Sequence, residues 1–244
     1  MHGVLLLSHG SRDPRAAAVI EELVRALALR SGLPVRSCHL DFTDPAPDVA
    51  LRQMAADGFT SVRVVPLLFT PGYHVTHDVP EAIGASGVAG RMDVSVAPAL
   101  VGDEPGAREL LLRALDERLT AAHPGGVDAI VLASAGSSSA EARSAAEGVA
   151  RDLGAARGVP AVAAFASAAE PSPADAVRHL RDGGAQHPVV ASLFVAPGRL
   201  PDAVTRSVDG VPVAEPLGAA DAFVDLLLLR ADVGTATAPG SSRG

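Results

Sequence analysis

The sequence predicts a parallel α/β protein built from two similar halves. Short apolar runs alternate with longer amphipathic segments along the chain, a pattern typical of a parallel sheet covered on both faces. The sequence also matches itself without gaps over most of a half-chain when it is shifted by 126 positions. Its 244 residues are enough for two ordinary domains. We therefore expect a first domain over 1–122, a second over 127–232 and a disordered tail over 233–244.

The residues that agree between the halves are mainly glycines and prolines, which set the shape of the backbone. They pair as Gly10 with Gly136, Gly32 with Gly158, Pro45 with Pro171, Gly58 with Gly184, Pro71 with Pro197 and Gly72 with Gly198. The polar residues of the first half are not kept in the second: His9 becomes Ala135, Arg12 becomes Ser138, Asp41 becomes Ser167 and His74 becomes Leu200. The comparison separates what the fold requires from what only the first half carries.

The elements of the first half follow from apolar periodicity and from the residues that begin and end each segment. Asp13 is a typical N-cap for a helix that has Pro14 in its first turn and Gly32 after its last. Asp44 and its counterpart Glu170 both precede a Pro-x-Pro sequence and are predicted to cap the helices that follow. The predicted strands are 3–8, 35–42, 61–68 and 93–98, and the predicted helices are 14–31, 47–57, 79–85 and 104–121.

The second half repeats this order of elements. Its predicted strands are 129–134, 161–167, 188–195 and 211–215, and its predicted helices are 140–156, 173–183 and 219–231. Ligands of parallel α/β sheets bind beyond the carboxyl ends of the strands. In the first half, His9, Asp41 and the loop carrying His74 follow the first, second and third strands. We therefore expect these three polar side chains to converge on one edge of the sheet.

The composition argues against several classes of partner. A 3% aromatic content without Trp disfavours surfaces on which bases stack, and the formal charge of −8 disfavours nucleic acids and anionic membranes. A single cysteine, Cys38, excludes an internal disulfide and suits a reducing cytoplasm. No signal peptide is apparent, and no run reaches the roughly 18 apolar residues of a membrane span. We expect a cytoplasmic protein.

His9, His74 and Asp41 form the candidate metal site. Two imidazoles and a carboxylate suit a borderline divalent ion, and a neutral imidazole can accept a proton near neutral pH. Each histidine also has a structural interpretation, as a strand-end residue bonded to backbone or as a surface loop residue. Their loss from the second half favours function. Asp44 is a rival carboxylate, and His77 is a fourth candidate ligand that equally well flanks a helix N-terminus.

Arg12 and Arg15 follow the His9 turn at a helix N-terminus, where backbone N–H groups and a guanidinium can hold an anion. For Arg15 we favour a solvent-exposed helix position. The remaining histidines have no comparable context. The predicted substrate-binding residues are Gly10, Ser11, Arg12, Gly72 and Tyr73. The histidines predicted to be ordinary surface or strand residues are His39, His123, His179 and His187.

Two motifs carry a resemblance to a known family. One is LLSHGSR over 6–12, and the other is PLLFTPGYHVTHDVP over 66–80. Together they resemble the sirohydrochlorin chelatases, the cobalt- and iron-inserting enzymes of cobalamin and siroheme synthesis. The resemblance covers nearly the whole chain and implies two tandem flavodoxin-like domains of the chelatase type, the second an inactive structural copy. It further implies that His9 and His74 bind the metal, with Asp41 at the place of an acidic residue that is often Glu.

The implied activity is that of a lyase that inserts a divalent metal ion into sirohydrochlorin without ATP and releases two protons. Fe²⁺, giving siroheme, is favoured because the chain lacks the His-rich tract of some cobalt or nickel chelatases. Co²⁺ is the alternative and Ni²⁺ a third option. His9, His74 and Asp41 are the implied catalytic residues, the ion and the tetrapyrrole are substrates, and no further cofactor is implied. Because a doubled chain can form its cleft within one molecule, we expect a monomer.

Two other functions stay open at this stage. A histidine phosphatase also places His-Gly at the end of its first strand, but an Arg precedes that histidine, where this chain has Ser8. A non-catalytic carrier of metal or tetrapyrrole would use the same histidines without turnover.

Overall fold

The computed structural model describes residues 1–70, 79–102, 104 and 106–232 of the chain. The first half contains β1 (His2–Ser8), α1 (Pro14–Ser31), β2 (Val35–His39), α2 (Pro47–Ala56), β3 (Ser61–Pro66), α3 (Val79–Ser86), β4 (Asp93–Val96) and α4 (Ala107–Ala122). The second half contains β5 (Ala129–Ser134), α5 (Ala140–Arg157), β6 (Ala161–Phe165), α6 (Pro173–Asp182), β7 (Pro188–Ser192), α7 (Arg199–Ser207) and α8 (Asp221–Arg230).

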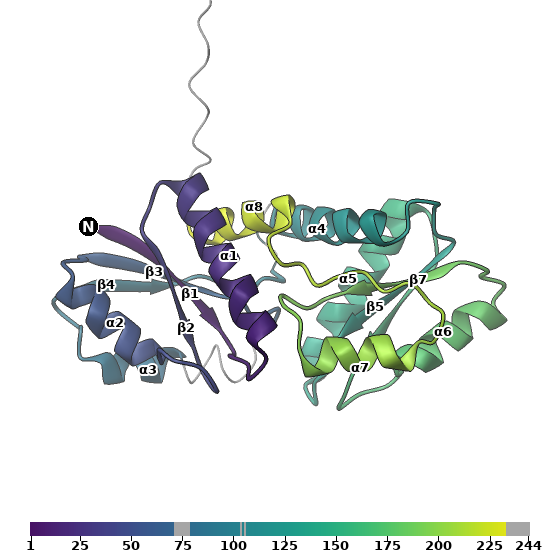
Figure 1. Cartoon of the computed structure of the whole chain (residues 1–244), viewed down its shortest axis with the longest axis horizontal. Helices are drawn as coiled ribbons and strands as arrows, with labels where there is room; N and C mark the ends of the chain where they lie inside the picture. Colours follow the sequence, from purple (N-terminus) through teal and green to yellow (C-terminus); the bar gives the residue numbers. More distant parts are fainter. Residues whose placement is uncertain (71–78, 103, 105, 233–244) are drawn as a thin grey trace, which may run out of the picture.

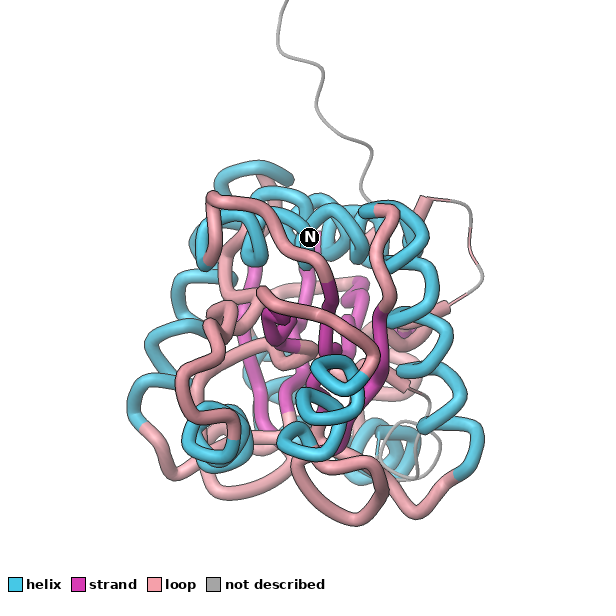
Figure 2. Tube along the Cα trace, turned by 90° about the vertical axis from the view of Figure 1, so that its right-hand side faces the viewer, coloured by secondary structure: helices cyan, strands magenta, loops and turns pink. Residues whose placement is uncertain are grey.

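Within the described residues these strands form two parallel sheets that lie next to each other, each covered by helices (Figures 1 and 2). The strand order is β2-β1-β3-β4 in the first sheet and β6-β5-β7 in the second, with β1 and β5 at interior positions. Burial on both faces explains why β1 and β5 are continuous apolar runs rather than alternating ones. The predicted parallel α/β class with two tandem units is confirmed.

The ends of the helices follow the sequence signals with one correction. Asp13 caps α1 by accepting a hydrogen bond from the backbone N–H of Arg15, and α1 ends at Gly32 in the left-handed conformation. Asp44 and Glu170 are not caps, because they lie two residues before the N-cap positions of α2 and α6. The carboxylate of Glu170 accepts a bond from the backbone N–H of Ser172, which is itself the N-cap of α6.

Two predictions for the second half are wrong. The segment 211–215 is not a strand: it forms one bridge, between Val190 and Val213, and Pro212 beside it has no N–H to extend the ladder. The helix α7 was not predicted, although its Pro201 lies in the first turn, where proline is tolerated. In the first half, β2 ends at His39 rather than at residue 42, and Phe42 adopts a φ of 63°.

The last helix of each half packs partly against the other half. α4 contacts β7 and α5 of the second half, and α8 contacts α1 of the first and lies against α4 (Figure 1). One apolar core cluster therefore contains residues of both halves, such as Leu23, Leu115 and Phe223. This shared core positions the two sheets relative to each other. None of the described helices combines the length and apolar content that a bilayer crossing requires.

Candidate functional site

A cavity of about 1420 Å³ lies where the carboxyl ends of the two sheets face each other. The first half supplies the turn after β1 and the segment after β3, and the second half supplies the turn after β5, the segment after β7 and the start of α7. Ligand pockets for drug-sized molecules measure roughly 300–1,000 Å³. This cavity can therefore admit a larger ligand, and its walls come from both halves.

The turn after β1 brings His9 to this cavity by a backbone geometry that only glycine allows. Gly10 has a φ of 92°, and a Cβ placed on it would lie 1.7 Å from the carbonyl oxygen of Asp41. The N–H of Asp41 donates to the carbonyl oxygen of His9 at 2.8 Å. The second half repeats this geometry: Gly136 has a φ of 89°, and its Cβ would lie 1.8 Å from the oxygen of Ser167. The turn is required by the fold, and His9 is an addition to it.

The ring of Phe42 lies close to both His9 and Arg12. Its ring is nearly parallel to the His9 imidazole, with 6.1 Å between centroids and 7° between planes, and the Arg12 guanidinium lies 4.7 Å from the ring centroid. The side chain is 57% exposed although its φ of 63° is unfavourable for a bulky residue. Its counterpart Ala168 has the same backbone conformation, with a φ of 58°, and no ring. The first half thus adds an aromatic side chain beside His9 and Arg12.

His39 is a cavity residue that the sequence analysis missed. It is only 7% exposed, it lines the cavity, and its Nδ1 lies 2.7 Å from the Ser8 hydroxyl oxygen in a hydrogen bond. The same hydroxyl accepts a bond from the backbone N–H of Gly10 at 3.2 Å. Burial lowers the pKa of His39, and the nearby carboxylate of Asp44 opposes this shift. The counterpart of His39 is Phe165, so the comparison of halves that selected His9 could have selected this residue as well.

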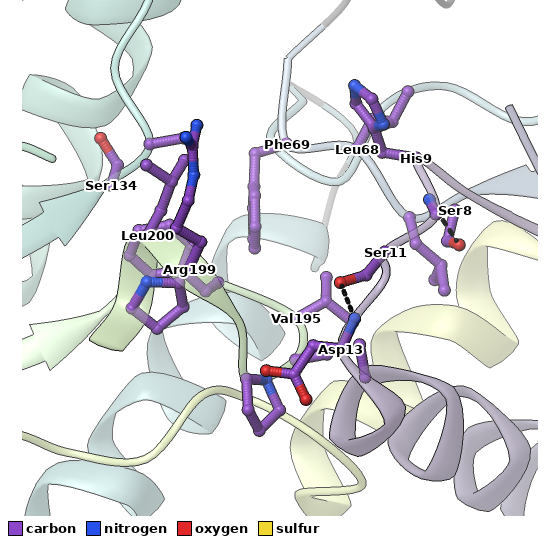
Figure 3. A pocket seen from close by; sticks show the side chains of 18 of the residues that line it. Ser8, His9, Ser11, Asp13, Leu68, Phe69, Ser134, Val195, Arg199 and Leu200 are labelled. Carbon is purple, nitrogen blue, oxygen red and sulfur yellow. Dashed lines mark hydrogen bonds between the residues drawn. The ribbon is translucent and has the colours of Figure 1, made fainter. Parts of the chain in front are cut away.

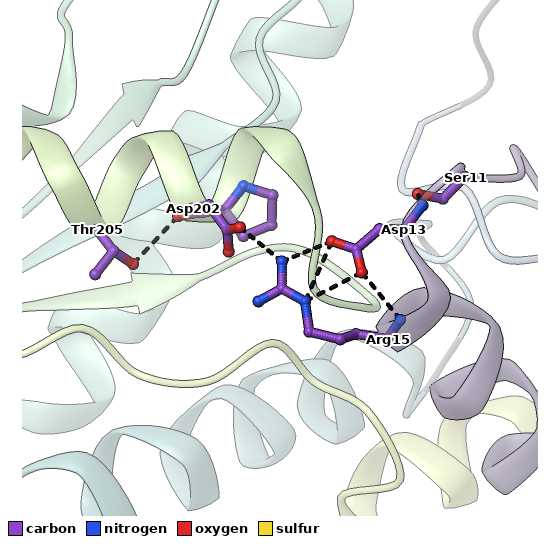
Figure 4. A network of polar contacts seen from close by, with 6 residues as sticks. Ser11, Asp13, Arg15, Asp202 and Thr205 are labelled. Carbon is purple, nitrogen blue, oxygen red and sulfur yellow. Dashed lines mark hydrogen bonds and ion pairs between the residues drawn. The ribbon is translucent and has the colours of Figure 1, made fainter.

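Arg15 links the two halves at the edge of the cavity (Figure 4). Its guanidinium forms ion pairs of 2.6 Å with Asp13 of its own half and with Asp202 of α7. These bonds raise the pKa of Arg15, and the hydrogen bond from Arg15 lowers the pKa of Asp13. The predicted solvent-exposed helix position is confirmed, with Arg15 side chain 54% exposed, but its charge is engaged between two carboxylates.

Only some of the predicted site residues line the cavity. The ones that line the cavity are His9, Gly10, Ser11 and Arg12. Asp41 contributes backbone contacts to the His9 turn, and it is not among the described residues that line the cavity. The ones that lie outside the described residues are Gly72, Tyr73, His74 and His77. Apart from residues 71–78, 103, 105 and 233–244, the chain forms no cluster of three or more His, Cys, Asp or Glu suited to a metal ion.

The second half contributes apolar and cationic side chains to the same cavity. Leu200, the counterpart of His74, lines it, and so does Arg199 at the start of α7. Figure 3 shows these two residues on the wall opposite His9, with Phe69 between the walls in this view. Ser134 stands at the end of β5 as Ser8 does at the end of β1. The cavity is therefore asymmetric, with the imidazoles on one wall and Arg199 on the other.

Comparison with known families finds one that accounts for both halves. The family model CbiX matches residues 3–122 and again residues 129–232. The sirohydrochlorin cobaltochelatase of Methanothermobacter thermautotrophicus is 32% identical over 82 residues, which are 34% of this chain and 57% of that protein. The corresponding protein of Saccharolobus islandicus is 37% identical over 87 residues, 36% of this chain and 67% of that protein. The matched segment thus spans little more than half of the first of these relatives.

A solved structure of similar fold covers nearly the whole chain. The structure of SirB from Bacillus subtilis with Fe³⁺ aligns with a TM-score of 0.77 at 21% sequence identity, over 96% of each chain. At this level of identity the likeness concerns the arrangement of both halves rather than their chemistry. It agrees with the two parallel sheets seen here.

Proposed function

This chain belongs to the CbiX family, and on that premise we propose that it inserts a divalent metal ion into sirohydrochlorin. The observation that carries the proposal is the cavity of about 1420 Å³ between the halves, with His9 on its wall. A tetrapyrrole is larger than a typical drug-sized ligand, which agrees with the size of this cavity. The names of the cobaltochelatase relatives point to the same substrate.

The proposed roles follow from what metal insertion needs. The ring nitrogens must lose two protons, and the metal ion must exchange its previous ligands for these nitrogens. We assign His9, His74 and Asp41 to binding the incoming ion, with Asp41 acting from beside the His9 turn rather than from the cavity lining, and one of the three to accepting the protons. Because the ion is a substrate, an open set of few ligands suits its release. Gly10, Ser11, Arg12, Gly72 and Tyr73 are assigned to binding the macrocycle, whose carboxylates suit backbone N–H groups and a guanidinium.

Iron and cobalt are both candidate substrates. The relatives compared above are named cobaltochelatases, whereas the Bacillus subtilis protein was solved with Fe³⁺. The preference for Fe²⁺ drawn from the missing His-rich tract stays a prediction, with Co²⁺ and then Ni²⁺ as alternatives. We also expect insertion without ATP by a monomer in the cytoplasm.

The test is a metal-insertion assay on the full chain. Metal-free sirohydrochlorin is mixed anaerobically with Fe²⁺, Co²⁺ or Ni²⁺, without ATP, and the absorbance change of the ring is followed. The protein should raise the rate above the spontaneous one, and His9→Ala and His74→Ala should each remove most of this increase. His179→Ala, an exposed histidine of α6, is the control and should leave the rate unchanged. Full activity in both His9→Ala and His74→Ala would refute the assignment.

A non-catalytic carrier gives a different result in the same assay. It would bind sirohydrochlorin or the ion without raising the insertion rate. Binding without acceleration would therefore replace the chelatase assignment with the carrier.

A further inference from the structure

Arg199 brings a positive charge into the cavity from the second half. It is the first residue of α7, it lines the cavity, and its side chain is exposed. Figure 3 shows it across the cavity from His9. The chain just before it reaches the first half, because a Cβ placed on Gly198 would lie 3.9 Å from the hydroxyl oxygen of Ser11. Arg199 therefore faces the same space as the His9 turn.

At the cavity, the aspartates are engaged in ion pairs and two of the arginines are not. Asp13 and Asp202 are both bound to Arg15. In the part of the chain that the structure describes, Arg12 and Arg199 form no ion pair with a carboxylate. The cavity wall itself carries two arginines, Arg12 and Arg199, and two aspartates, and the carboxylates of both aspartates are already bound by Arg15 from outside the wall. The Arg12 and Arg199 guanidinium groups on the wall are therefore left without a carboxylate partner, which favours an anionic ligand.

The position of Arg199 in the repeat shows that this charge is not part of the shared fold. It corresponds to Tyr73 of the first half, and the next residue, Leu200, corresponds to His74. The second half therefore has no imidazole at this place and has a guanidinium beside it. An exposed arginine without an ion-pair partner contributes little to stability. Its place on the cavity wall suits ligand binding instead.

We propose that Arg199 binds a carboxylate of the macrocycle, so that the second half takes part in substrate recognition. The proposal rests on the proposed function, whose substrate carries eight carboxylates. Arg12 acts in the same way from the first half, and the ring lies between the two guanidinium groups. Charge-assisted hydrogen bonds from both sides bind the ring in the cavity.

The test measures binding of metal-free sirohydrochlorin to the full chain by absorbance titration. Arg199→Ala should weaken binding about tenfold, the size of the loss of one charge-assisted hydrogen bond. Arg199→Lys should recover part of the affinity because it keeps the charge. The control is Arg206→Ala, an exposed arginine of the same helix that lines a neighbouring depression and not the cavity, and it should bind as the wild type does. Higher salt should reduce the difference between wild type and Arg199→Ala.

Steady-state insertion kinetics separate recognition from a general structural defect. Arg199→Ala should raise the KM for sirohydrochlorin about tenfold and leave kcat and the KM for the metal ion unchanged. If Arg199→Ala bound the ring with wild-type affinity, or if Arg206→Ala lost as much affinity, the role of Arg199 would be overturned. The proposed chelatase function would not be affected. A wild type that binds the ring but inserts no metal would overturn the chelatase assignment and leave the role of Arg199 standing. Failure of the wild type to bind the ring would overturn both.

Discussion

The turn after β1 and the turn after β5 place a glycine at nearly the same left-handed angle and receive equivalent hydrogen bonds from the neighbouring strand end. Beside Arg12 and Asp41, three further side chains distinguish the first turn and its surroundings from the second: His9 replaces Ala135, Phe42 replaces Ala168 and His39 replaces Phe165. The two turns therefore share one backbone conformation, and they differ in the side chains that it carries. The difference separates the residues that the fold needs from those that are free to serve the proposed reaction.

The most severe test of this difference is to turn the first turn into the second. His9→Ala should lower the insertion rate about 10³-fold. The metal ion loses a ligand, and the site loses a candidate acceptor for the protons of the ring nitrogens. The free energy of unfolding should stay close to that of the wild type, since Ala135 occupies the same place in the second half. Insertion kinetics and urea unfolding measure the two quantities. A large loss of stability would mean that His9 supports the fold.

Alanine at the shared glycines should have the opposite effect. Gly10→Ala and Gly136→Ala should each lower the free energy of unfolding by about 3 kcal/mol, because the new Cβ meets a carbonyl oxygen at a positive φ. Urea unfolding of both variants measures this cost. Gly32→Ala is the control, since its Cβ would meet no atom within 4 Å and only the φ of 68° is unfavourable. Unequal costs at Gly10 and Gly136 would show that the turns are less alike than their backbones.

Much of the fold could be predicted from the sequence because local signals and tertiary structure agree. Asp13, Pro14 and Gly32 mark the ends of α1 as expected. The segment 211–215 was misjudged because its apolar pattern resembles a strand, while Pro212 has no N–H for the ladder. The prediction for α7 failed because its Pro201 obscures a short helix.

The candidate site was predicted in part, for a physical reason. His9 could be found because its counterpart is a small residue that cannot do its chemistry. His39 was overlooked because a histidine within a strand is usually structural, and only burial and the bond to Ser8 give it a place in the cavity. The sequence gives Arg199 no comparable signal, because it lies in the half that lacks the histidines. Its importance depends on which side chains face each other across the cavity.

A smaller effect is expected where the halves share an unfavourable backbone angle. Ala168→Gly should raise the free energy of unfolding by about 0.5–1 kcal/mol, because a φ of 58° costs alanine more than glycine. Phe42→Gly gains the same relief but loses the contacts of the ring with His9 and Arg12, so its stability should change little. Its insertion rate should fall about tenfold as His9 loses its orientation. Urea unfolding and insertion kinetics of the two variants test this. An unchanged insertion rate in Phe42→Gly would show that the Phe42 side chain has no role in insertion.

The smallest expected effect concerns the pH dependence of stability. Burial lowers the pKa of His39 below its usual 6.5, so the unfolded chain binds a proton at this residue more readily than the folded chain. Stability is therefore lost as the pH falls from about 7 toward the lowered pKa of the folded state. His39→Phe, which copies Phe165, removes this proton uptake. Its free energy of unfolding should fall less than that of the wild type between about pH 7.5 and pH 5.5.

The control for this pH effect is Ser8→Ala, which removes the hydrogen bond but keeps the imidazole. Because burial is the main cause of the shift, this variant should lose stability with falling pH much as the wild type does. Urea unfolding at the two pH values measures all three proteins. If His39→Phe kept the wild-type slope, another group would be responsible. If His39→Phe flattened the slope and left insertion unchanged, His39 would belong to the stability of the first half rather than to its chemistry, and it would leave the list of functional differences between the two turns.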